Sequence, residues 1–77
     1  MNAVLSKSRS AVWAALRVWA AQIRDSKSAP IDDRLLAITL VSVLDSYEIL
    51  GREDLWATCL VAAQKLVETG RYTFPLS

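Results

Sequence analysis

Apolar residues recur with the period of an α-helix in three segments of this chain, and nowhere do they alternate with polar residues as in a β-strand. The three segments cover about residues 5–25, 31–50 and 52–69, and an irregular tail follows over residues 71–77. The turns between the segments are short, and short connections favour antiparallel neighbours. The sequence therefore predicts a single all-α domain over residues 1–77, a small antiparallel three-helix bundle.

Proline, serine and glycine mark the ends of the predicted helices. Pro30 suits the first turn of the second helix, and Ser28 is the residue that we expect to cap it. Gly51 and Gly70 follow the second and third helices, where glycine adopts the left-handed conformation of a helix end at little cost. Carboxylates in a first turn stabilise the positive end of the helix dipole, and acidic pairs occupy that place in both helices: Asp32 with Asp33, and Glu53 with Asp54.

The second predicted helix is apolar on two sides. Its broad face holds Leu36, Ala37, Leu40, Val43, Leu44, Tyr47 and Leu50. A smaller apolar patch, made of Leu35, Ile38 and Ile49, lies nearly opposite. A helix of this kind is either central in a bundle or sandwiched between subunits.

The other two predicted helices each have one main apolar face. That face holds Leu5, Val12, Leu16, Trp19 and Ile23 in the first helix, and Leu55, Trp56, Cys59, Leu60, Ala63, Leu66 and Val67 in the third. Trp13 and Val18 lie outside the face of the first helix and indicate a second contact surface there. Apolar side chains also recur in the tail, and we expect Tyr72, Phe74 and Leu76 to fold back onto the bundle.

The apolar content is high for so short a chain, since 53% of the 77 residues are hydrophobic. A small domain has too much surface to bury all of them, so we expect the excess to lie in an interface with another chain, above all in a homodimer. Trp and Arg are enriched at the energetic centres of such interfaces. The predicted contact residues are Trp13, Arg17, Val18, Leu35, Ile38 and Ile49.

Charge is unevenly distributed along the chain. Residues 1–27 hold five basic residues and one acid, a net charge of +4, whereas residues 28–54 hold two basic residues and six acids, a net charge of −4. The simplest interpretation is electrostatically matched packing within the bundle or between two copies. The alternative is a basic face on the first helix that contacts nucleic acid, anionic lipid or an acidic protein, and its residues would be Lys7, Arg9, Arg17 and Arg24.

Little in the composition suits catalysis. The chain has no His and one Cys, which removes most metal sites and nucleophile–base pairs. Cys59 falls on an apolar helix face, and each pair of neighbouring carboxylates diverges by 100° on a helix. The two glycines stand alone at helix ends, so no phosphate-binding loop is present. We therefore expect no enzyme activity, no metal site and no cofactor.

Cysteine usage and hydropathy bear on the compartment. One Cys cannot form an internal disulfide, which is typical of a cytoplasmic protein, and the longest uncharged runs are half the length needed to cross a bilayer. Residues 1–24 contain Arg and Ser but no acid, as organelle transit peptides do, although we favour the first helix of the fold.

Taken together, these features predict a non-enzymatic protein–protein interaction module, that is, a small helical regulator, inhibitor or adaptor that binds a partner protein, itself, or both. The alternative is a nucleic-acid-binding regulator that uses the basic face of the first helix.

Overall fold

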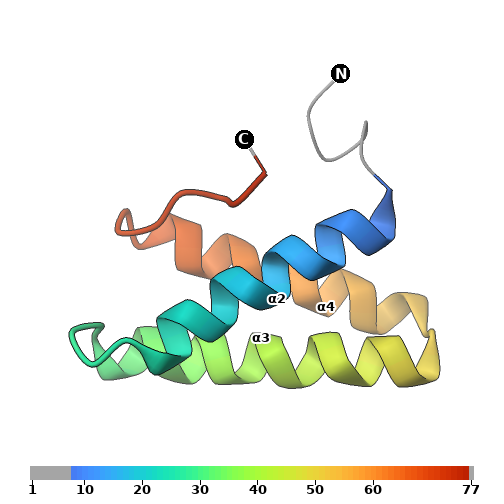
Figure 1. Cartoon of the computed structure of the whole chain (residues 1–77), viewed down its shortest axis with the longest axis horizontal. Coiled ribbons are helices and arrows are strands. Elements are labelled where there is room, and N and C mark those ends of the chain that lie inside the picture. The colour runs from blue at the N-terminus through green and yellow to red at the C-terminus, as the bar shows by residue number, and fades with distance from the viewer. Residues whose placement is uncertain (1–7, 77) are drawn as a thin grey trace.

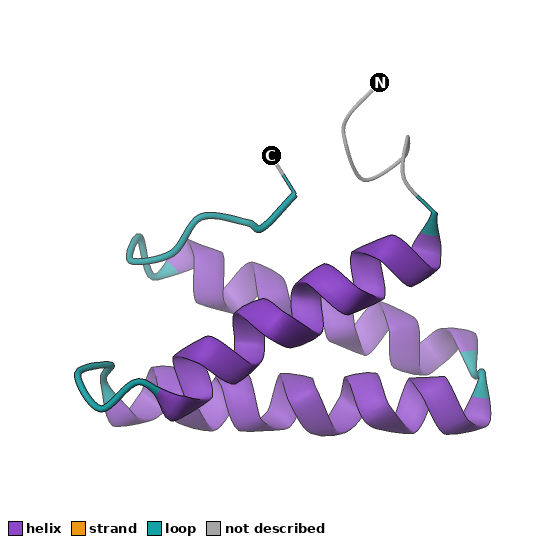
Figure 2. Cartoon of the chain, viewed as in Figure 1, coloured by secondary structure: helices purple, strands orange, loops and turns teal. Residues whose placement is uncertain are grey.

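The computed structural model describes residues 8–76 of the chain. These residues form three α-helices, α2 (Arg9–Asp25), α3 (Ile31–Leu50) and α4 (Glu53–Glu68), and no strand (Figures 1 and 2). Successive helices run in opposite directions, and a non-helical tail follows α4. The predicted all-α class with three helices is confirmed.

The first helix begins four residues later than the sequence predicts. Ser8 has extended backbone, and its Oγ accepts a hydrogen bond from the Ala11 N–H at 3.3 Å. A serine in this position satisfies one of the amide groups that a helix start leaves without a partner. The helix therefore starts at Arg9 rather than near residue 5, and Leu5 and Lys7 lie outside the described residues.

The ends of α3 match the predicted range of 31–50, although the expected cap does not form. Pro30 itself occupies the N-cap position, and no side chain caps the helix there. The Ser28 hydroxyl instead lies 3.2 Å from the hydroxyl of Ser26. At the other end, Gly51 has a φ of 67° and its N–H donates to the Tyr47 carbonyl at 2.7 Å, which is the predicted glycine helix end.

The helix α3 is the one that contacts both of the other helices most extensively. It packs against both α2 and α4, whereas the backbones of α2 and α4 approach each other at few points. Figure 1 shows α3 along one edge of the molecule, with both neighbours on the same side of it. The core between them holds Val12, Leu16, Ala20 and Ile23 of α2, Ala37, Leu40, Val41 and Leu44 of α3, and Trp56, Cys59, Ala62, Ala63 and Leu66 of α4.

The tail folds back onto the bundle as predicted. Tyr72, Phe74 and Leu76 are partly buried against the core. The ring of Trp19 lies 6.5 Å from that of Tyr72 in an edge-on arrangement and 6.4 Å from that of Phe74. Aromatic pairs at these separations add to the stabilisation from buried area, so the tail belongs to the folded unit.

Among the helices of residues 8–76, none combines the length and the apolar character of a membrane-spanning segment.

Candidate functional site

An apolar stripe runs along the solvent side of α3. Its members follow alternating steps of four and three residues, except that Asp45 occupies the position between the last two, and this spacing keeps them on one side of a helix. That side is opposite the core residues of α3. We call this stripe the α3 outer face, and it consists of Ile31, Leu35, Ile38, Ser42 and Ile49.

The large side chains of the α3 outer face are exposed. The relative accessibilities are 63% for Ile31, 53% for Leu35, 45% for Ile38 and 81% for Ile49. Single apolar residues on a surface are ordinary, but an aligned set along one helix marks an interaction site. Val61 of α4, at 56%, is the contrasting case, because three of its four neighbours on the same side of that helix, Thr58, Gln64 and Lys65, are polar.

The structure places three of the predicted contact residues on one face and a fourth, Arg17, at its border. Leu35, Ile38 and Ile49 lie on the α3 outer face, whereas Val18 is exposed at 60% on α2. Trp13 is half-buried, and its indole N–H donates to the Leu44 carbonyl at 2.8 Å. Its polar atom is therefore already paired within the bundle.

Arg17 borders the α3 outer face through an ion pair. Its Nε and Nη2 donate to the two carboxylate oxygens of Asp45 at 2.7 and 3.1 Å. The Arg17 guanidinium holds the pKa of Asp45 below its ordinary value, and desolvation opposes this only in part. The pair joins α2 to α3 and holds the Asp45 carboxylate at the α2 side of the face.

The remaining basic residues of α2 are paired with acids as well. Arg9 donates to both oxygens of Glu53 at 2.6 and 2.8 Å, and its guanidinium lies 5.2 Å from the centre of the Trp56 ring. Arg24 makes two hydrogen bonds to Asp25. Of the four residues predicted as a basic contact surface, the three that are described thus each meet a carboxylate, and Lys7 lies outside the described part.

A buried carboxylate fastens the tail to α3, and sequence reasoning missed it. Asp33 is 1% exposed, and it accepts two hydrogen bonds from Arg71, both at 2.7 Å, and one from the Tyr72 hydroxyl at 2.7 Å. The hydrogen bonds from Arg71, helped by Tyr72, keep the pKa of Asp33 below its ordinary value. We call these three residues the tail clasp. The sequence position of Asp33 could have indicated its burial, because Asp33 lies on the same side of the helix as the buried residues Ala37, Leu40 and Leu44.

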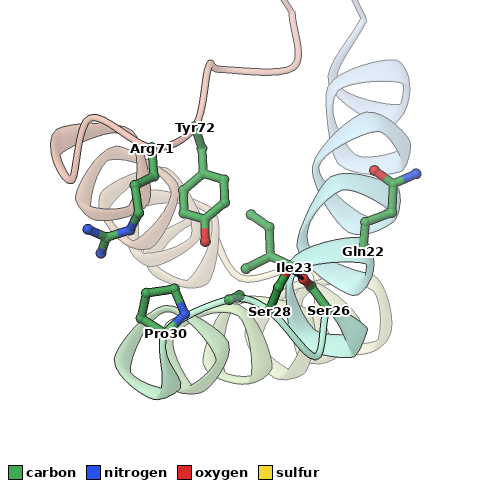
Figure 3. Close-up of a pocket in the computed structure, with 8 residues that line it drawn as sticks. Gln22, Ile23, Ser26, Ser28, Pro30, Arg71 and Tyr72 are labelled. Atoms are coloured by element: carbon green, nitrogen blue, oxygen red, sulfur yellow. Dashed lines mark hydrogen bonds between the residues drawn. The ribbon is translucent and has the colours of Figure 1, made fainter.

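A pocket of about 350 Å³ lies next to the tail clasp, between the end of α2, the loop before α3 and the tail (Figure 3). Gln22, Ser26, Ser28, Arg71 and Tyr72 contribute its polar groups. The Arg71 and Tyr72 groups are already bound to Asp33. No carboxylate, thiol or imidazole is among the lining residues of the described chain, so these residues hold no nucleophile–base pair.

The thiol of Cys59 is part of the core. Burial raises its pKa to about 11, so the group is held in its unreactive protonated form. Within residues 8–76, no three potential metal ligands gather into one cluster.

No protein-family model matches this chain, and comparison with curated proteins and with solved structures likewise finds no match.

Proposed function

We propose that this chain is a non-enzymatic protein–protein interaction module, a small helical regulator, inhibitor or adaptor that contacts its partner through the α3 outer face. The observation that supports this most strongly is the alignment of four exposed aliphatic side chains along 19 residues of one helix, Ile31 to Ile49. The single free Cys, buried in the core, leads us to place this function in the cytoplasm.

The exposed side chains of the α3 outer face would gain free energy if a partner removed them from water. Burying a Leu or Ile side chain fully is worth about 1.5–3 kcal/mol, and each of the four side chains has roughly half or more of that still to gain. Association also costs about 4–15 kcal/mol in lost freedom. The face is thus strong enough to direct binding, and a stable complex needs contacts beside it as well.

The α3 outer face is a better candidate for the binding surface than the basic side of α2. A phosphate-binding surface needs cationic groups that are available to phosphate oxygens. Arg9, Arg17 and Arg24 would first have to leave the carboxylates that they now bind. The electrostatic match between α2 and its acidic neighbours therefore favours protein contact over the nucleic-acid alternative.

Two lysines on the α3 outer face should abolish partner binding without unfolding the chain. The variant is Leu35→Lys with Ile38→Lys, and charges there oppose transfer of the face out of water. We expect at least a tenfold loss of partner proteins captured by the tagged chain from an extract of its host, measured by quantitative mass spectrometry. The helical circular dichroism should stay the same, because both positions are exposed.

Val61→Lys is the matched control, since it places the same charge at an equally exposed aliphatic position away from the face. It should capture partners as the native chain does. Capture that is equal for all three chains, or absent for the native chain together with no self-association, would contradict the proposed function.

A further inference from the structure

The spacing of the α3 outer face specifies the kind of surface that fits it. Steps of four and three residues over Ile31, Leu35, Ile38, Ser42, Asp45 and Ile49 repeat every seven residues. This repeat is the seam of two helices that cross at about 20° and interlock their side chains. The α3 outer face is therefore shaped for another helix with the same repeat, and α3 itself is one.

The distribution of large and small residues favours an antiparallel pair. Around a two-fold axis through the middle of α3, Ile38 lies opposite Ser42 of the second copy, and Ile31 lies opposite Ile49. The remaining layer sets Leu35 opposite Asp45, whose carboxylate is already bound by Arg17 of its own chain. A large side chain facing a small one lets two helices interlock. A parallel pair would instead place the two Asp45 carboxylates beside each other, which costs electrostatic energy.

Charged residues on one flank of the α3 outer face also favour the antiparallel pair. Arg34 and Glu48 are fourteen residues apart, so they lie on the same flank of α3, and Arg34 marks it as the α2 side by donating to the Arg24 carbonyl at 3.1 Å. Neither residue forms an ion pair with another residue of 8–76. In the antiparallel pair, Arg34 of each copy meets Glu48 of the other, at both ends of the seam.

We propose that the partner of the α3 outer face is the same face of a second copy, in an antiparallel two-fold dimer with ion pairs between Arg34 and Glu48 across the seam. This inference rests on the proposed function and names its partner.

The test is sedimentation of the native chain and of charge-reversal variants over a range of protein concentrations. Arg34→Glu and Glu48→Arg should each weaken the dimer by about tenfold, because each creates two like-charge contacts per dimer. The double variant should recover the native affinity. Residues 34 and 48 of one helix are about 21 Å apart, so recovery cannot come from a contact within one chain.

Two controls keep the test independent of folding. Glu68→Arg makes the same charge change on the exposed surface of α4 and should leave the dimer unaffected. Arg34→Glu also removes the hydrogen bond to Arg24, so Glu48→Arg decides the outcome if the former variant loses helix content.

A native chain that stays monomeric at every concentration overturns the inference, and so does a double variant no better than the single ones. If such a monomer still captures other proteins, and loses them with Leu35→Lys and Ile38→Lys, the proposed function stands and only the identity of the partner is wrong.

Discussion

Replacing Leu44 with Ala should unfold a large share of the protein at 25 °C. Leu44 of α3 is fully buried in the core shared with α2 and α4, and its carbonyl accepts the hydrogen bond from the Trp13 indole. Truncating a buried leucine costs about 2–5 kcal/mol, from lost burial and from the cavity that remains. A core in a chain of this size supplies only about 3–5 kcal/mol in total. The loss is therefore comparable to the whole stability.

Urea denaturation followed by circular dichroism measures this loss, with Val61→Ala as the control. Val61 is exposed, so its truncation should change the free energy of unfolding by less than about 0.5 kcal/mol. If the Leu44→Ala variant were as stable as the control, the described core would not be the core of the protein in solution.

Removing the tail clasp should free the tail and alter the response to acid. The folded pKa of Asp33 lies below its unfolded value, chiefly because Arg71 donates to its carboxylate. The clasp therefore contributes its full stabilisation above the unfolded pKa, and this contribution is lost as the pH falls below about 4 and passes through the folded pKa. The Asp33→Asn variant should be less stable than the native chain at pH 7 and should lack this part of the acid dependence.

Tryptic cleavage after Arg71 gives an independent measure of the clasp. In the native chain the Arg71 side chain is held by Asp33 and the tail packs on the core, so release of residues 72–77 should be slow. In Asp33→Asn the same cleavage should be much faster, while cleavage at Lys65, within α4, should change little. Equal rates at Arg71 in both chains, with equal acid unfolding, would mean that the clasp holds nothing in place.

Local sequence signals were sufficient for most of the helix limits. The 31–50 range and the glycine helix end at Gly51 follow from periodicity and from the left-handed conformation that glycine adopts easily. The start of α2 was placed too early because the apolar spacing continues to Leu5, while the capping action of Ser8 decides the first helical residue. Ser28 was expected as a cap because serine often is one, but Pro30 occupies that position.

The candidate site could be predicted in part, and the missing parts depend on contacts distant in sequence. Leu35, Ile38 and Ile49 are visible as a second apolar side of α3, and Ile31 extends the same spacing but was not included. The buried role of Asp33 requires Arg71, which is 38 residues away, and the pairing of Trp13 with the Leu44 carbonyl spans 31 residues. Neither contact leaves a pattern within a single helix, so periodicity alone does not reveal them.

Isoleucine methyl groups report how far the α3 outer face is exposed to solvent. The chain has four isoleucines, of which Ile31, Ile38 and Ile49 lie on the α3 outer face and Ile23 lies in the core. Labelling these methyl groups for NMR and adding a soluble paramagnetic compound measures how far each is shielded from solvent. Ile23 serves as the internal reference for full burial.

The decisive result is the shielding of these three methyl groups when a partner is present. As the protein concentration is raised, or unlabelled host extract is added, Ile31, Ile38 and Ile49 should become nearly as shielded as Ile23. If all three stay fully exposed under both conditions, the α3 outer face binds no protein and the proposed interaction surface is wrong.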